Sequence, residues 1–361
     1  MSATKQRTEY FLGANSAEGF VSLYDQWVDQ KTIQAFYVIK GGAGCGKSTL
    51  MGRVAAWMEQ EGYEVEYIRC SGDPDSLDGI RIPEKGAAMV DGTSPHEMDP
   101  AYTGATGHYI DLGAGYDRTG LFAIREEIVA AVQAYRTCYP AAYRCIRTAK
   151  ESWDRGRKPL RTQETLEKTA KRAESILKRE LKGTREGRGT GCRRFLGGVT
   201  CQGKVFLEGT VQNLCREGYE IRDDYGLAGE LLACLEQGFL ERGYDVIACP
   251  SGVEPGRLAH LLIPDRALAF VTGKVTGAAF RTIRTESLVE KQALQEGKSF
   301  LRLSNRVAEE LLKEGMEHLA RAKENHDRLE QLYRPYVDFS LAEEMAEKIA
   351  REILELPDKV S

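Results

Sequence analysis

The chain has 361 residues, with 50 lysines and arginines against 54 aspartates and glutamates and a formal net charge of −4 at pH 7. This length predicts two domains, each with its own core, and the composition excludes the disordered, fibrous and disulfide-stapled classes. No apolar run approaches the roughly 20 residues that span a membrane, and the N-terminus lacks the apolar core of a signal peptide. Nine cysteines without Cys-x-x-Cys spacing favour reduced thiols, so we expect a cytoplasmic protein.

An internal repeat organises the chain. When the sequence is shifted by 181 residues, the segment 62–92 aligns without a gap on 243–273, and 10 of the 31 positions are identical. A second match lies upstream, where FLGANSAEGFVSL from Phe11 resembles FLGGVTCQGKVFL from Phe195. The sequence therefore predicts a tandem duplication.

The repeat sets the expected domain boundaries. Residues 1–182 form the first domain and residues 194–361 the second. The segment 183–193 between them is rich in glycine and charge, which is typical of a linker.

The first repeat begins with an apolar run, Ala35 to Ile39, whose aromatic and β-branched residues predict a buried strand. A glycine-rich turn follows, and then a helix that ends at Gly62. Two more strands are expected at Glu64 to Cys70 and at Ala87 to Val90, the latter stopped by Asp91-Gly92. Strands that alternate with helices predict an α/β fold with a parallel, doubly wound sheet.

Long charged helical stretches end both repeats, from about Gly120 in the first and from Glu286 to about Leu356 in the second. We therefore expect each half to be an α/β core with an appended long helical hairpin. The stretch 141–194 has an excess of positive charge, so nucleic acid could bind there electrostatically. Few aromatic residues and several i,i+4 charge pairs favour instead a solvated helical face or docking to an acidic partner.

The turn after the first strand reads GGAGCGKST and fits the Walker A pattern Gly-x-x-x-x-Gly-Lys-[Ser/Thr]. Its glycines let the backbone curl so that successive N–H groups point at phosphate oxygens, and the following helix adds its N-terminal dipole. The predicted phosphate-binding residues are Gly41, Gly42, Ala43, Gly44, Cys45, Gly46, Lys47, Ser48 and Thr49.

Three side chains carry the chemistry that this motif implies. Lys47 places a cation on the β- and γ-phosphates, and the Ser48 hydroxyl ligates Mg²⁺. The magnesium site also needs a carboxylate at the end of a neighbouring strand, and Asp91 is the best candidate. The alternative is that Asp91 is the turn former of an Asp-Gly pair.

The residue that activates water is less clearly marked, because no glutamate follows Asp91. We consider Asp78 a catalytic candidate, together with Asp73, Asp75 and His96. A turn, capping or solvated-loop role is the alternative for each of them.

The second repeat has lost these side chains. In their places the alignment puts other residues: Ala228 for Lys47, Gly229 for Ser48, Thr272 for Asp91 and Ala259 for Asp78. The equivalent loop, RDDYGLAGEL, also gains the carboxylates Asp223, Asp224 and Glu230, which would repel phosphates. We expect the second half to be a degenerate copy that serves as scaffold or regulator.

Nearly the whole chain resembles a family of uncharacterised bacterial ATPases related to nucleotide kinases and built from two P-loop-like halves. The resemblance rests on FLGANSAEGFVSLYD, GGAGCGKST, SGDPDSLDG with IRIP, DGTSPHEMDP and the closing HDRLEQLYRPYVDF. It implies ATP binding at Gly41 to Thr49.

The leading hypothesis is a Mg²⁺-dependent P-loop ATPase with one active nucleotide site, whose cycle moves the helices or a macromolecular partner. One alternative is a small-molecule or nucleotide kinase with an unknown acceptor. Another is a nucleotide-gated binding module with negligible turnover. ATP is favoured over GTP because no Asn-Lys-x-Asp motif is present.

Overall fold

The computed structural model describes residues 7–95, 97–181 and 183–359. The first lobe is a six-stranded sheet in the order β1-β5-β6-β7-β4-β8. Its strands are β1 (Thr8–Phe11), β4 (Ala35–Lys40), β5 (Glu66–Arg69), β6 (Leu77–Ile82), β7 (Ala87–Asp91) and β8 (Gly107–Asp111). Helix α1 (Lys47–Gln60) packs on β6 and β7.

The expected strands in 35–39, 64–70 and 87–90 are confirmed as β4, β5 and β7, and the helix before Gly62 as α1. The expectation of a parallel sheet is wrong, because β6 runs antiparallel to both β5 and β7. A turn at Pro83–Gly86 joins β6 to β7, and the Gly86 N–H donates to Pro83 O at 3.0 Å. So short a connection makes the strands antiparallel, since a parallel crossover needs a dozen or more residues.

The second lobe repeats this sheet strand for strand, in the order β16-β12-β15-β14-β13-β9. Its elements are β9 (Gly191–Arg193), β12 (Glu217–Arg222), α6 (Ala228–Glu241), β13 (Val246–Pro250), β14 (Leu258–Ile263), β15 (Leu268–Val271) and β16 (Arg281–Arg284). Even an irregularity is shared: the register shifts between Ile68 and Arg69 in β5 and between Cys249 and Pro250 in β13. These positions are 181 residues apart, so the structure confirms the tandem duplication.

A common hydrophobic core joins the lobes. Each lobe carries an antiparallel hairpin, β2 (Gly13–Ser16) with β3 (Gly19–Ser22) and β10 (Gly197–Thr200) with β11 (Gly203–Phe206), and the second adds α5 (Glu208–Leu214). One buried cluster contains Tyr24 and Phe36 from the first lobe together with Val211 and Val271 from the second. The two lobes are therefore packed into one body.

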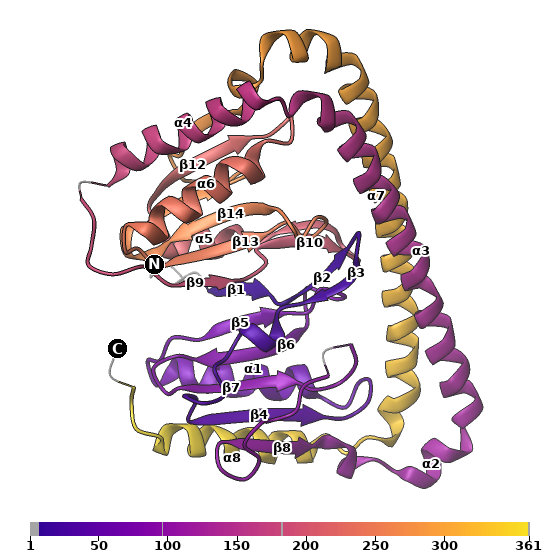
Figure 1. Cartoon of the computed structure of the whole chain (residues 1–361). Coiled ribbons are helices and arrows are strands. Elements are labelled where there is room, and N and C mark those ends of the chain that lie inside the picture. Colours follow the sequence, from indigo (N-terminus) through magenta and orange to yellow (C-terminus); the bar gives the residue numbers. More distant parts are fainter. Residues whose placement is uncertain (1–6, 96, 182, 360–361) are drawn as a thin grey trace.

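The long helices do not form one hairpin per half. Helix α3 (Arg125–Arg157), which follows the short α2 (Arg118–Ala123), pairs instead with α7 (Lys291–Tyr333). Figure 1 shows the two helices side by side along both lobes. The residues buried along this seam include Ala142, Ile146, Ala149, Ala308, Leu312 and Leu319.

The helices that follow this pair are exchanged between the lobes. Helix α4 (Gln163–Glu180) belongs to the first half of the chain but packs on α6 of the second lobe, where Ile176 is buried. Helix α8 (Ser340–Glu355) belongs to the second half but packs on α1 of the first lobe, where Ile349 is buried (Figure 1). Each sheet is thus covered by a helix from the other half.

The expected linker, 183–193, also belongs to the second lobe. Its last three residues form β9, the edge strand that runs parallel to β13. The Arg185 N–H donates to Arg242 O at 3.0 Å. Within the described ranges, none of the helices combines the length and the apolar character that a membrane span requires.

Candidate functional site

The glycine-rich loop connects β4 to α1 as the sequence predicts. Gly44 has φ +67° and Gly46 has φ +93°, both in the left-handed region that favours glycine. Gly46 is the N-cap of α1, and the helix begins at Lys47. The loop therefore leads directly into the free N–H groups of the first helical turn. Thr49 is exposed on that turn, whereas Cys45 is buried beneath the loop.

Lys47 lies against the loop and close to Asp91. Its Nζ donates to Gly41 O at 3.0 Å and to Gly42 O at 2.8 Å. The same Nζ lies 3.6 Å from Asp91 Oδ2. The ammonium has three protons, so the two loop carbonyls leave one for an anionic partner.

Asp91 reaches this position because β7 pairs with β4, with Asp91 opposite Ile39 in the register. Asp91 Oδ1 accepts hydrogen bonds from Thr93 N–H at 2.9 Å and from Thr93 Oγ1 at 2.6 Å. These bonds orient the carboxylate so that Oδ2 faces Lys47. Ser48 Oγ accepts from Leu77 N–H at 3.0 Å, which holds the hydroxyl at the start of α1. The structure thus brings Lys47 and Asp91 together beside the loop.

Asp78 lies elsewhere. Its neighbour Leu77 packs with the residues of α1, and because side chains alternate along a strand, Asp78 points to the opposite face of the sheet. There it is 4 % exposed, and its Oδ2 accepts a hydrogen bond from Tyr24 Oη at 3.0 Å. Asp78 is therefore not brought to Lys47.

The other candidate bases are also engaged. Asp73 Oδ2 lies 3.4 Å from Lys323 Nζ of α7, and Asp75 Oδ2 accepts from Gln202 Nε2 at 2.7 Å. His96 lies outside the described residues. Cys45 packs in the buried core beneath the loop, and this burial raises the pKa of its thiol.

Sequence reasoning missed the residues that cover the loop from the second half of the chain. A Cβ placed on Gly44 would lie 3.3 Å from Glu330 Cα, and one on Gly42 would lie 3.5 Å from Tyr333 Cε1. Both residues are in the last turn of α7. Their motif, HDRLEQLYRPYVDF, is visible in the sequence, but nothing in it shows that it faces a loop so distant along the chain.

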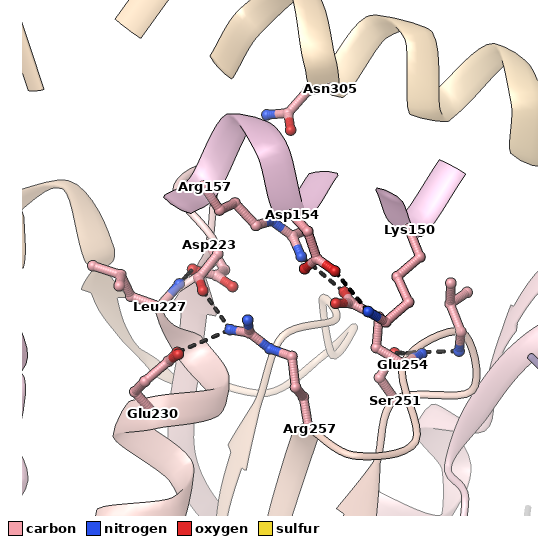
Figure 2. Close-up of polar contacts among 12 residues, drawn as sticks. Lys150, Asp154, Arg157, Asp223, Leu227, Glu230, Ser251, Glu254, Arg257 and Asn305 are labelled. Atoms are coloured by element: carbon pink, nitrogen blue, oxygen red, sulfur yellow. Dashed lines mark hydrogen bonds and ion pairs between the residues drawn. The ribbon is translucent and has the colours of Figure 1, made fainter. Parts of the chain in front are cut away.

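The equivalent loop of the second lobe is filled by its own charged side chains (Figure 2). Asp223 Oδ1 accepts from Leu227 N–H at 2.7 Å, just before α6 begins. Glu230 Oε2 lies 2.8 Å from Arg257 Nη2, and Glu230 also pairs with Arg161. Asp223 thus accepts the hydrogen bond of a loop N–H, and Glu230 neutralises the charge of Arg257 and Arg161.

A cavity of about 680 Å³ opens beside this second loop. It is lined by cations and carboxylates in nearly equal number, namely Lys150, Lys158, Arg161 and Arg257 with Glu18, Asp154 and Glu254. Most of these charges are already paired: Lys150 Nζ lies 2.6 Å from Asp154 Oδ2, and Arg157 Nη1 lies 2.8 Å from Glu254 Oε2 (Figure 2). The cavity therefore offers a nearly balanced set of charges.

The fold and this site define a duplicated α/β protein with two mixed six-stranded sheets and a glycine-rich loop at the head of a helix in the first lobe. One segment of the chain matches the model of a known family. A family model described as Nephrocystin 3, N-terminal, matches residues 21–80, which contain β4, the loop and α1. No curated protein and no solved structure matches the chain.

Proposed function

We propose that the first lobe binds Mg²⁺–ATP at the loop Gly41–Thr49 and hydrolyses it. The observation that carries this proposal is the position of Lys47, at the N-terminus of α1 and 3.6 Å from a carboxylate at the end of the adjacent strand. A strand, a glycine-rich loop and a helix that begins with lysine form the arrangement that cradles phosphates.

The residues present suit the triphosphate chemistry. The loop N–H groups and the remaining Lys47 proton would stabilise the negative charge on the phosphates. Ser48 Oγ and Asp91 Oδ2 are oxygen donors of the kind that Mg²⁺ prefers, so these two residues would hold the ion. Bound there, the ion would neutralise charge on the β- and γ-phosphates.

The proposed reaction is the in-line attack of water on the γ-phosphorus. The new P–O bond forms as the bond to the bridging oxygen of ADP breaks, and the proton of water passes to solvent through the released phosphate. The chain contributes position and charge to this step, through Lys47 and the loop amides.

The second lobe supplies no comparable site in this proposal. Where the first loop presents Lys47, the second has Ala228. The Glu230 carboxylate pairs with Arg257, and the Asp223 carboxylate accepts the hydrogen bond of Leu227 N–H. These two carboxylates therefore make the contacts that phosphate oxygens would otherwise make. We infer that the second lobe is a scaffold that holds α3, α4 and α7.

The direct test is Lys47→Ala, with Lys348→Ala as the matched control because Lys348 is an exposed lysine on α8. A charge-assisted contact contributes about 1.5–3 kcal/mol, so loss of Lys47 should weaken ATP binding about tenfold or more and nearly abolish phosphate release. Titration calorimetry and a phosphate-release assay measure the two effects, and the control should match the wild type.

The same assay separates the alternatives when mononucleotides and small hydroxyl compounds are added as acceptors. A phosphorylated acceptor would identify a kinase. Tight ATP binding without phosphate release would identify a binding module. Phosphate release that Lys47→Ala leaves unchanged would overturn the site itself.

A further inference from the structure

Each loop is covered by the long helix of the other half of the chain. In the first lobe the last turn of α7 lies on the phosphate loop, with Glu330 against Gly44. In the second lobe Arg157, the last residue of α3, lies against Gly226, where an added Cβ would fall 2.4 Å from Arg157 Cδ. The same contact thus occurs twice, but the residue that the phosphate loop meets is acidic.

One backbone N–H of the phosphate loop is already hydrogen-bonded to a tyrosine. The Gly42 N–H donates to Tyr116 Oη at 2.6 Å. Tyr116 is held in place by Tyr333 of α7, with 5.6 Å between the ring centroids. One N–H cannot donate fully to both a phenol and a phosphate oxygen, so phosphate binding competes with this contact.

Negative charges near the end of α7 also disfavour phosphate binding at the loop. Glu330 and Asp327 stand one turn apart, and Asp73 approaches from the first lobe. Lys323 pairs with both Asp73 and Asp327, whereas the partner of Glu330 is His326, at 3.7 Å from Nδ1 to Oε1. Glu330 lies with its Cα and Cβ beside Gly44, so its carboxylate adds a negative charge to the helix end that covers the loop and makes phosphate binding there less favourable.

We propose that Glu330 and the Tyr116–Tyr333 pair form a latch on the phosphate loop, which Mg²⁺–ATP must open by displacing the last turn of α7. This inference rests on the proposed function and adds its regulation. Because α7 is one continuous helix that also contacts β10 of the second lobe, opening the latch transmits nucleotide binding to that lobe. The second half thereby sets the nucleotide affinity of the first.

Two variants test the latch while every residue of the loop keeps its identity. Glu330→Gln removes the charge, and Tyr116→Phe removes the hydroxyl that occupies Gly42 N–H while keeping the ring. Both should tighten ATP binding by about fivefold or more, with no loss of phosphate release per bound nucleotide. Glu317→Gln is the matched control, because Glu317 is a half-exposed glutamate on the same helix.

Lys47→Ala, measured in parallel, separates this proposal from the proposed function. Loss of binding in Lys47→Ala together with an unchanged Kd in both latch variants would overturn the latch and leave the nucleotide site standing. Loss of phosphate release in Glu330→Gln at unchanged Kd would also overturn the latch and would make Glu330 a water-positioning carboxylate. Absence of ATP binding in every variant and in the wild type would overturn both proposals.

Discussion

The backbone amides of Phe11 and Phe195 each donate a hydrogen bond to the carbonyl oxygen of the other, at 2.9 and 3.0 Å. The two residues occupy the same position in the two repeats, FLGANS and FLGGVT. When equivalent residues bond reciprocally, a twofold axis passes between them. The lobes are thus related as the subunits of a symmetric dimer would be, within one chain.

This symmetry accounts for the exchange of helices. The long helix of each half runs along both lobes, so the helix that follows it packs on the lobe of the other half. Helix α4 therefore covers α6, and α8 covers α1. The nucleotide site proposed for the first lobe is accordingly covered by residues from the second half of the chain.

Asp91→Asn tests the proposed magnesium role. The amide keeps the size of the side chain and an oxygen for Thr93, but it loses the charge that would hold Mg²⁺. Phosphate release should fall by much more than ATP affinity, as measured in parallel by release assays and calorimetry. Equal rates in variant and wild type at saturating Mg²⁺ would assign the metal to other oxygens.

We expect the second loop not to bind nucleotide, so that the chain binds one nucleotide in all. Restoring the lysine alone, by Ala228→Lys, should fail to create a second site, because Asp223 still occupies Leu227 N–H and Glu230 still neutralises Arg257. Calorimetric titration of the wild type and the variant gives the number directly. Two sites of similar affinity in the wild type would contradict the degenerate copy.

His260 predicts a pH dependence of stability. Its ring is buried on β14 against Phe206, and its Nδ1 accepts from Thr272 N–H at 3.3 Å. Burial lowers the pKa of His260 from 6.5 to about 3. Below pH 6.5 the unfolded chain binds a proton that the folded chain does not. The folded state therefore loses about 1.4 kcal/mol of stability per pH unit as the pH falls toward 3.

His260→Gln removes this titration. Between pH 6.5 and 5 the free energy of unfolding of the wild type should fall by about 1.6 kcal/mol more than that of the variant. Urea unfolding at the two pH values measures the difference, from which the contributions of all other groups cancel. Parallel pH profiles would contradict this prediction, because they would mean that His260 has the same pKa in the folded and the unfolded protein.

The exchanged helices predict which lobe each substitution weakens. Ile349→Ala on α8 and Ile176→Ala on α4 each leave a cavity in a fully packed core, at a cost of about 2–5 kcal/mol. Hydrogen exchange should accelerate most in α1 for Ile349→Ala and most in α6 for Ile176→Ala. The reverse pattern would mean that each helix stabilises the half of the chain to which it belongs.

The sequence alone predicted β4, α1, β5 and β7 of the first lobe and the duplication. The apolar run at Ala35, the glycines of the loop and the helix after Lys47 are short-range signals, because a few neighbouring residues decide them. Ten identities in 31 positions likewise needed no structure to read. The sequence also placed Asp91 at the end of a strand, and there it lies beside Lys47 because the carboxyl ends of adjacent parallel strands meet at one edge of a sheet.

Three features depend on tertiary structure: the formation of β6, the pairing of the long helices, and the packing of α7 over the phosphate loop. The Asp78-Gly79 pair weakens the strand pattern of β6, which forms because it is paired on both sides and because Trp27 packs over Gly79. An amphipathic helix reveals which of its faces is buried, but not the surface against which that face packs. The surface against which α7 packs follows from the twofold relation of the lobes at Phe11 and Phe195. Because of that relation, α7 extends to the first lobe and Glu330 lies against Gly44.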